Sequence, residues 1–151
     1  MLSQGVSFGI NRATFAIHQE WNLPARPEQV TPVVEQMTAF IARTGILAGR
    51  EAEVELALQE AVSNAVVHGC SGDASKTVSC WIGCDPVTGV VIVIRDPGPG
   101  FDTSHPPNPL SGAGMAADHG RGLYLIRSLM DDVAYERGGT ELHMWKRPEP
   151  S

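Results

Sequence analysis

Two different periods in the spacing of apolar and polar residues predict where the strands and helices of this chain lie. Between Ala13 and Trp21 apolar and polar residues alternate, which is typical of a half-buried strand. Residues 76–84 and 90–96 predict two more strands, joined by the turn-rich segment DPVTG. Residues 133–138 and 139–147 predict a last hairpin that turns at Gly138 and Gly139.

Helical spacing of the apolar residues predicts three helices. The first lies within residues 23–45, has prolines near its start and ends at Gly45. The second covers residues 50–69, and the third covers residues 121–132. The stretch from Thr103 to His119 is rich in proline and glycine and has no period, so we expect a long loop there, of the kind that often forms a functional lid.

The order of these elements is β–α–α–β–β–loop–α–β–β, which predicts the α+β fold class. Short turns join consecutive strands, so the sheet is expected to be mixed and mostly antiparallel. With helices on one face, the expected architecture is a two-layer α/β sandwich. The other face of the sheet is then expected to be solvated or covered by a partner.

Composition and charge narrow the class of protein. The chain has 151 residues, of which 42% are hydrophobic and 19% charged, so we expect a single globular domain over 1–151. The net charge of −6 argues against a non-specific nucleic-acid binder, which needs a surplus of Lys and Arg. No stretch approaches the roughly 18 apolar residues of a membrane span, and no signal peptide is visible. We therefore expect no direct nucleic acid, no membrane and a cytoplasmic location.

The three cysteines are Cys70, Cys80 and Cys84. Their number is odd and no CxxC pair occurs. Cys80 and Cys84 point to the same face of the predicted strand but are too far apart along it to pair directly. We interpret all three as buried, reduced thiols.

A stripe of polar residues on the second predicted helix is the first candidate site. In LQEAVSNAVVHG, residues Glu60, Asn64 and His68 recur every four positions, at the edge of an apolar stripe. That apolar stripe consists of Val54, Leu58, Ala61 and Ala65. The polar stripe fits either a solvated flank or the lining of a cavity, and the helix alone leaves both open.

The stretch RDPGPGFD, at the end of a predicted strand, is the second candidate. Gly98 and Gly100 follow Asp96 and would let a ligand approach the backbone closely. A buried, ionised Asp96 only accepts hydrogen bonds, so it would suit an exocyclic amine or an arginine. An ordinary Pro-Gly turn after a strand is the alternative.

The stretch HGRGLYLIRSLM is the third candidate. Gly120 and Gly122 lie where the predicted loop becomes a helix, and free N–H groups at a helix N-terminus bind anions such as phosphate. Arg121 would add a positive charge. A flexible start to an ordinary core helix is the alternative.

Taken together and in this order, the three motifs resemble the Bergerat-fold (GHKL) ATP-binding domain of histidine kinases, Hsp90, MutL and type II topoisomerases. The N-box of that family matches Glu60 and Asn64, with His68 and Gly69 completing it. Its first glycine box matches Asp96, Gly98 and Gly100. The remaining matches are the second glycine box and a threonine near the adenine, at Gly120, Arg121, Gly122, Leu123 and Thr140.

Within this superfamily the chain is most similar to the anti-sigma factor serine/threonine kinases of bacterial partner-switching systems. The matching stretches are EAVSNAVVHG and RGLYLIRSLMDDV. The segment before the N-box is too short for the dimerisation helix of a histidine kinase. Where the family often has an aromatic residue after the N-box, this chain has Cys70.

The resemblance implies ATP and Mg²⁺ as cofactors, with Asn64 as the metal ligand and Glu60 as the general base. Asp96 would accept the adenine amine, with Gly98 and Gly100 shaping the base pocket. The segment from Gly120 to Leu123 would cradle the phosphates as a flexible ATP lid at about 102–120 closes. His68 is given no chemistry, and the residues expected in the core rather than the pocket are Val62, Ala65 and Ile126.

The implied function is phosphorylation of a STAS-type anti-anti-sigma protein by a kinase that also binds a sigma factor or another effector. A homodimer is expected on the same ground. The alternatives are a nucleotide-gated protein-binding module and a stand-alone GHKL ATPase. The presence of Glu60 favours the kinase, because a pure binding module needs no base.

Overall fold

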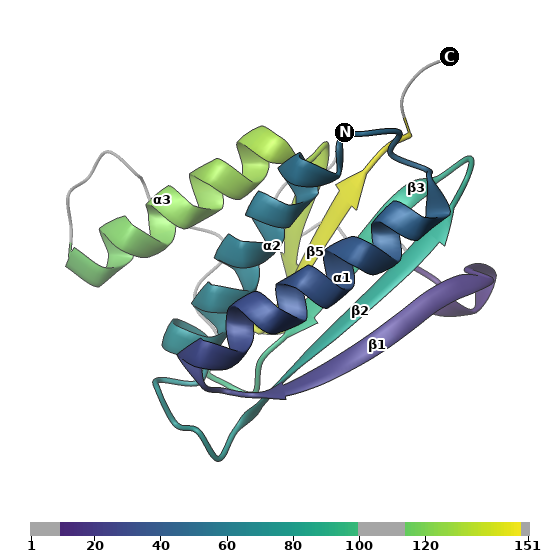
Figure 1. Cartoon of the computed structure of the whole chain (residues 1–151). Coiled ribbons are helices and arrows are strands. Elements are labelled where there is room, and N and C mark those ends of the chain that lie inside the picture. Colours follow the sequence, from purple (N-terminus) through teal and green to yellow (C-terminus); the bar gives the residue numbers. More distant parts are fainter. Residues whose placement is uncertain (1–9, 100–113, 149–151) are drawn as a thin grey trace.

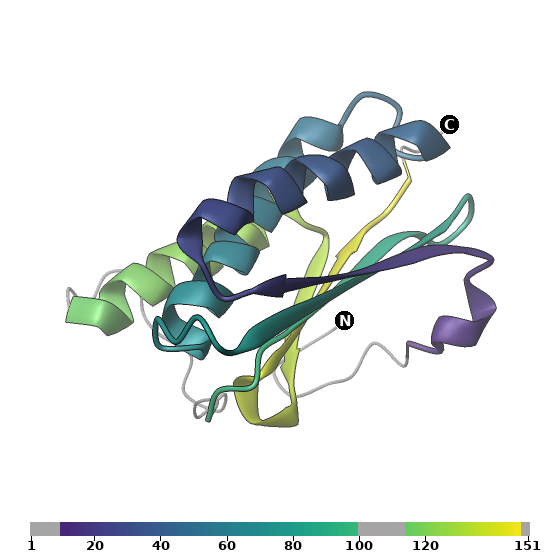
Figure 2. The ribbon, with the colours of Figure 1, turned by 60° about the horizontal axis from the view of Figure 1, so that its bottom comes forward.

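A five-stranded sheet carries helices on one face, as Figures 1 and 2 show for the computed structural model of this chain. The structure describes residues 10–99 and 114–148, and within residues 114–121 it describes the backbone only. The strands are β1 (Ile17–Pro24), β2 (Thr77–Asp85), β3 (Gly89–Arg95), β4 (Asp132–Glu136) and β5 (Glu141–Lys146). Their order is β1-β2-β3-β5-β4, and all neighbours are antiparallel.

The predicted fold class is confirmed. The sheet, expected to be mixed and mostly antiparallel, is antiparallel throughout the described residues. The first strand begins at Ile17, later than the predicted Ala13. Asn11 explains the difference, because its side-chain oxygen accepts the Ala13 N–H at 3.1 Å and caps the short turn η1 (Arg12–Thr14) instead.

Helices α1 (Val30–Thr44) and α2 (Glu51–Asn64) lie across the same face of the sheet (Figure 2). Helix α1 follows the short turn η2 (Pro27–Gln29) and ends at Gly45, as predicted. Gly45 has a φ of 70°, a left-handed conformation that costs glycine little. Helix α2 continues into one turn of π-helix, η3 (Ala65–Gly69), so the second predicted helix is not regular at its end.

Helix α3 (Gly114–Leu129) begins earlier than predicted. The sequence predicted a loop from Thr103 to His119, and the last part of that prediction is wrong. The residues after Gly114 are Met, Ala and Ala, which are strong helix formers. The glycines of the stretch HGRG therefore lie inside the helix. Residues 100–113, which include Gly100 and most of the predicted lid, lie outside the described residues.

The main core lies between the sheet and the helices. The largest side chains that are almost fully buried are Leu23, Met37, Ile41, Leu47, Leu58, Ile82, Ile92, Ile126 and Met144. All three cysteines are buried and free, as predicted. Burial raises the pKa of Cys80 and of Cys84 to about 12. These thiols therefore pack as small apolar groups.

The opposite face of the sheet, called the outer face below, carries a second and smaller apolar cluster. It is formed by Phe15, Trp81, Val91 and Val93, all buried. The rings of Phe15 and Trp81 meet edge to face with centroids 5.5 Å apart. The chain's own N-terminal segment thus contributes to covering this face, which was expected to be solvated or covered by a partner.

Candidate nucleotide-binding site

The polar stripe on α2 borders the core, as the helical geometry predicted. Glu60 and Asn64 are half-buried. The adjacent apolar stripe is buried: Val54 and Leu58 are 0% exposed and Ala61 is 3% exposed. The two polar side chains are therefore held at a fixed place at the margin of the core.

Gly122 of α3 lies against this stripe. A Cβ placed at Gly122 would come within 2.9 Å of Asn64 Nδ2 and 3.1 Å of Glu60 Oε2. Because glycine has no side chain, α3 can approach the amide and the carboxylate this closely. The fold thus brings together three residues that the sequence assigned to two separate motifs.

The other predicted phosphate-binding residues lie in the same helix but not at its N-terminus. Gly120 and Arg121 belong to the backbone of α3, well after Gly114. The prediction of free N–H groups at a helix start there is wrong for this conformation, because N–H groups inside a helix bond to the preceding turn. Leu123 is 3% exposed and belongs to the core beside Ile126.

Asp96 lies at the end of β3 and is fixed by two backbone hydrogen bonds. Its Oδ1 accepts the Gly98 N–H at 2.8 Å, and its own N–H donates to the Thr140 carbonyl at 2.9 Å. The Thr140 hydroxyl donates to the Arg137 carbonyl at 2.9 Å. The predicted residues Asp96, Gly98 and Thr140 therefore meet at one edge of the sheet.

Burial raises the pKa of the Asp96 carboxyl above its usual range. The Gly98 N–H and the positive charge of Lys76 act in the opposite direction, but burial dominates. Asp96 is half-buried, and an acceptor of this kind gains when a ligand supplies a hydrogen-bond donor to it.

Gly69 lies directly against Asp96. The sequence placed Gly69 at the end of the N-box but gave it no role in the site. A Cβ at Gly69 would lie 2.3 Å from Asp96 Cγ, and a Cβ at Gly98 would lie 2.0 Å from the Gly69 carbonyl oxygen. Gly69 and Gly98 therefore lie so close to each other and to the Asp96 side chain that neither leaves room for a side chain of its own. The available signal was the glycine that ends the motif VVHG.

The π-helical turn η3 lies between Asn64 and Gly69. Its last bond runs from the Cys70 N–H to the Ala65 carbonyl at 3.0 Å, one residue further back than in an α-helix. Turns of this kind often occur at functional sites. Here a single helical segment carries Glu60 and Asn64 against α3 and then Gly69 against Asp96.

The described residues contain no group of three or more His, Cys, Asp or Glu side chains that could hold a metal ion. A Mg²⁺ ion that keeps several waters and binds phosphate oxygens needs few protein ligands. The side-chain carbonyl of Asn64 fits that requirement. In the same part of the chain, no helix is long and apolar enough to cross a membrane.

The chain combines an antiparallel two-layer sandwich with an acid and an amide that lie against a glycine of α3, and with an aspartate at the end of β3 that lies against the same helical segment. This combination is the one that the sequence motifs predicted for a nucleotide-binding domain. A family model described as the histidine kinase-like ATPase domain matches residues 23–146, so the chain belongs to this family. The resemblance inferred from the three motifs is thereby confirmed.

Curated relatives of the chain carry the name serine-protein kinase RsbW. The protein of that name from Staphylococcus epidermidis is 32% identical over 136 residues, which cover 84% of each chain. The protein from Bacillus subtilis is 28% identical over 120 residues, 76% of this chain and 74% of its own. The one from Oceanobacillus iheyensis is 29% identical over 123 residues, 76% and 75% of the two chains. The chain is accordingly classed with the ATP-dependent serine/threonine protein kinases.

Proposed function

We propose that this chain transfers the γ-phosphoryl group of ATP to a serine or threonine of a STAS-type anti-anti-sigma protein and also binds a sigma factor. The observation that carries the proposal is that Glu60 and Asn64 lie against Gly122 of α3, while the helical segment that carries them ends at Gly69, which lies against Asp96. The proposed base, metal ligand and adenine acceptor then belong to one continuous site. The names of the relatives support a protein hydroxyl as the acceptor.

At the adenine end, Asp96 accepts the exocyclic amine of the base. The raised pKa of this carboxyl reflects its burial, and the amine supplies the donor that a buried acceptor requires. We propose that Gly98 leaves room for the base, together with Gly100, which lies outside the described residues. Thr140 is linked to Asp96 by the backbone hydrogen bond between them. The preference for adenine follows from this hydrogen bond, because guanine carries a carbonyl where adenine carries the amine.

At the phosphate end, Asn64 is the protein ligand of Mg²⁺, which would neutralise charge on the phosphate oxygens. The segment Gly120–Leu123 lies next to the phosphates, and Arg121 contributes a positive charge. We propose that this segment and the lid at about 102–120 rearrange when nucleotide binds, since the glycines lie inside α3 in the conformation described.

Glu60 acts on the acceptor hydroxyl. Its carboxylate accepts the proton of the serine or threonine while the oxygen attacks the γ-phosphorus and the bond to ADP breaks. The half-buried position of Glu60, beside Gly122, leaves it close to the nucleotide and open to a second protein.

The test is incubation with labelled ATP, Mg²⁺ and the STAS protein encoded by a neighbouring gene. We expect label on a serine or threonine of that protein, near-complete loss with Glu60→Gln, and loss of Mg-dependent ATP binding with Asn64→Ala. Glu55→Gln is the matched control, because Glu55 is an exposed glutamate on the same helix. If Glu60→Gln transferred phosphate at the wild-type rate, Glu60 could not be the general base.

ATP binding without any transfer would instead favour the nucleotide-gated binding module. ATP consumption without a protein acceptor would favour the stand-alone ATPase. The proposed homodimer and the cytoplasmic location are tested separately, the first by sedimentation of the full chain and the second by cell fractionation. A monomer at micromolar concentration would remove the dimer from the proposal without affecting the site.

A further inference from the structure

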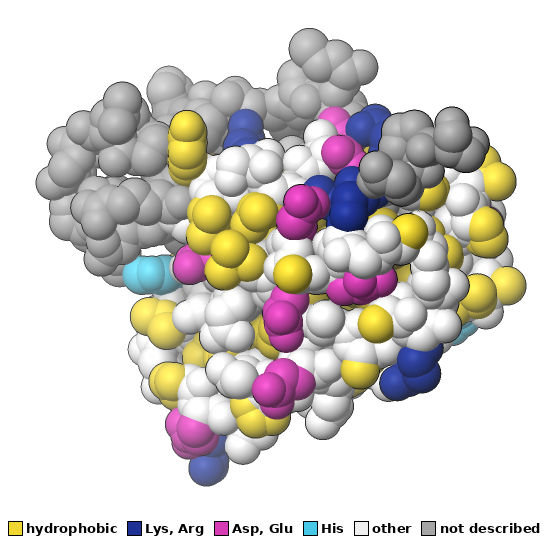
Figure 3. Space-filling view, turned by 45° about the horizontal axis from the view of Figure 1, so that its top comes forward, with side chains coloured by type: hydrophobic (Ala, Val, Ile, Leu, Met, Phe, Trp, Pro, Cys, Tyr) yellow, Lys and Arg dark blue, Asp and Glu magenta, His cyan; other side chains and the backbone are white. Residues whose placement is uncertain are grey.

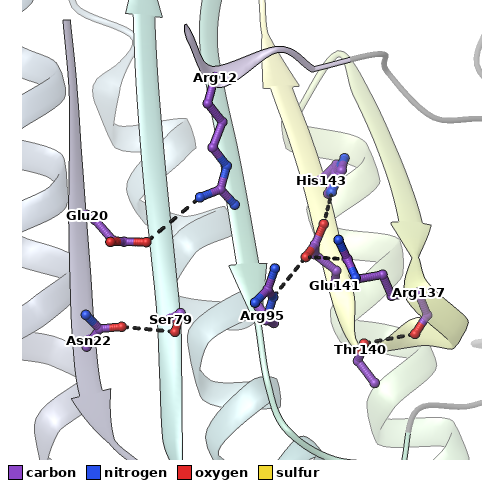
Figure 4. Close-up of polar contacts among 9 residues, drawn as sticks. All are labelled: Arg12, Glu20, Asn22, Ser79, Arg95, Arg137, Thr140, Glu141 and His143. Atoms are coloured by element: carbon purple, nitrogen blue, oxygen red, sulfur yellow. Dashed lines mark hydrogen bonds and ion pairs between the residues drawn. The ribbon is translucent and has the colours of Figure 1, made fainter.

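A buried carboxylate on the outer face of the sheet lies directly behind the proposed adenine site. Glu141 is 6% exposed. Its Oε2 lies 3.0 Å from Arg95 Nε and 3.3 Å from Arg137 Nε, and its Oε1 lies 2.7 Å from His143 Nε2. Figure 4 shows these side chains converging on Glu141 from β3, from β5 and from the turn between β4 and β5.

Each of the two arginines is connected to a residue of the nucleotide site. Arg95 and Glu141 face each other across β3 and β5, and the residues next to them, Asp96 and Thr140, form the following backbone bond. Successive side chains of a strand point to opposite faces. The Asp96 carboxyl group lies against Gly69 on the helix side, behind the ion pair of Arg95 and Glu141 on the outer face. Thr140 lies in the turn before β5, with helical backbone angles, and its carbonyl accepts the Asp96 N–H.

Arg137 provides the second connection. Its φ is 52°, a left-handed conformation that a residue with a side chain adopts at a cost. The Arg137 carbonyl accepts both the hydroxyl and the N–H of Thr140, at 2.9 and 3.4 Å. By binding the Arg137 side chain, Glu141 holds the turn that orients the Thr140 hydroxyl (Figure 4).

Glu141 stays ionised in this environment. Burial acts to raise its pKa, but the hydrogen bonds from His143 and Arg95 outweigh burial, and the pKa lies below its usual range. The hydrogen bonds to Arg95 and His143 and the ion pair with Arg137 together restrict where these three side chains lie.

We propose that Glu141 is a positioning residue for the nucleotide site: by holding Arg95 and Arg137 it fixes Asp96 relative to Thr140 and so sets the preference for adenine. This inference rests on the proposed nucleotide site. Glu141 does not touch the nucleotide, because it lies on the other face of the sheet.

The experiment compares wild type and Glu141→Gln, which keeps the size of the side chain and removes its charge. Binding of Mg·ATP and of Mg·GTP is measured by calorimetry, and phosphoryl transfer to the STAS protein is measured as a function of ATP concentration. We expect ATP affinity to fall about fivefold, the ratio of ATP to GTP affinity to shrink about threefold, and kcat at saturating ATP to stay within about twofold of wild type.

Glu20→Gln is the matched control. Glu20 lies on the same face and forms an ion pair with Arg12 at 3.8 Å, but its side chain is 56% exposed (Figure 4). We expect this variant to keep the wild-type ATP affinity and base preference. If Glu141→Gln binds ATP and GTP as tightly as wild type does, the proposal is overturned. Equal losses of affinity for both nucleotides would also overturn it.

Arg137→Ala gives a second route if Glu141→Gln does not fold. The Arg137 side chain is 68% exposed, so its removal leaves the core intact. We expect a reduced preference for ATP over GTP in the same direction, and an unchanged preference would overturn the proposal. If wild type itself binds no ATP, the proposed function fails instead, and the two failures are thus distinguished.

Discussion

Gly69 contacts the carboxyl group of Asp96 through a bare Cα, and a Cβ there would lie 2.3 Å from Asp96 Cγ. No side chain fits between the end of the π-helical turn and this carboxyl group. Gly69 therefore allows the Asp96 carboxyl group to lie where it does, because any side chain at residue 69 would displace it.

We expect Gly69→Ala to displace the Asp96 carboxyl group and to lower ATP affinity about tenfold, with a loss of about 1–3 kcal/mol in the free energy of unfolding. Calorimetry and urea unfolding measure the two effects. Gly45→Ala is the control, because Gly45 at the end of α1 has a φ of 70° and nothing within 4 Å of its added Cβ, so only the cost of the backbone conformation is expected there. Wild-type ATP affinity in Gly69→Ala would contradict the steric argument.

Asp96→Asn is expected to separate stability from binding. Burial raises the pKa of Asp96 in the folded chain above its unfolded value, so the ionised form destabilises the fold, and this cost appears as pH rises through the folded pKa. At pH 7 the asparagine variant should be at least as resistant to urea as wild type. The difference should vanish as pH falls below the usual range of an aspartate.

The same variant should bind ATP about tenfold more weakly, because the charged acceptor for the adenine amine is lost. Titration with Mg·ATP at pH 7 measures this. Lower stability together with unchanged ATP affinity would show that Asp96 has a structural role only.

Lys146 is a buried cation that ties three elements together. Lys146 is only 5% exposed. Its Nζ lies 2.7 Å from Glu53 Oε1 of α2 and donates a hydrogen bond to the Leu129 carbonyl at the end of α3. We expect Lys146→Met to cost about 1–3 kcal/mol in urea unfolding, because both acceptors lose their donor. Glu53→Gln should cost less, since the Glu53 side chain is 48% exposed and can be hydrated. Equal stability of Lys146→Met and wild type would contradict this.

The thiols are expected to be inert in the folded chain. Cys80 and Cys84 have a pKa of about 12 because they are buried, and Cys70 is 0% exposed with a raised pKa. Ellman's reagent should therefore modify none of them at pH 8, and all three in denaturant. Rapid modification of one thiol in the native state would show that its segment opens readily.

The surface around the helices has a mixed chemical character. On the face shown in Figure 3, acidic side chains are scattered among hydrophobic ones. The exposed large hydrophobic residues of the described chain include Leu56 and Val67 on the helical segment that carries Glu60. Such isolated residues occur on most soluble proteins and need no special explanation.

The features that depend on local periodicity could be predicted from the sequence. The apolar stripe of α2 is buried as expected, and the placement of Glu60 and Asn64 at its edge follows from the fixed rotation per residue of a helix. The three motifs could be assigned to one ligand because each supplies a different chemistry, and the family match supports that assignment.

The features that depend on packing between distant segments could not be predicted from the sequence. The start of α3 at Gly114 reflects helix-forming residues after a glycine and proline-rich stretch, where local signals conflict. The π-helical turn and the role of Gly69 depend on Asp96, which approaches from another strand. Glu141 gave no signal, because Arg95 becomes its neighbour only when β3 and β5 pair.

The pairing of β1 with β2 has a consequence for the order in which the chain folds. Strands β2 and β3 are joined by a tight turn and pair locally, whereas β1 pairs with β2 only after both α1 and α2 have been made. Closing a long loop is slow compared with forming a hairpin. During synthesis on the ribosome, Trp21 and Leu23 of β1 therefore remain without their strand partners until β2 emerges, so the sheet cannot bury these side chains before the residues of β2 have been added.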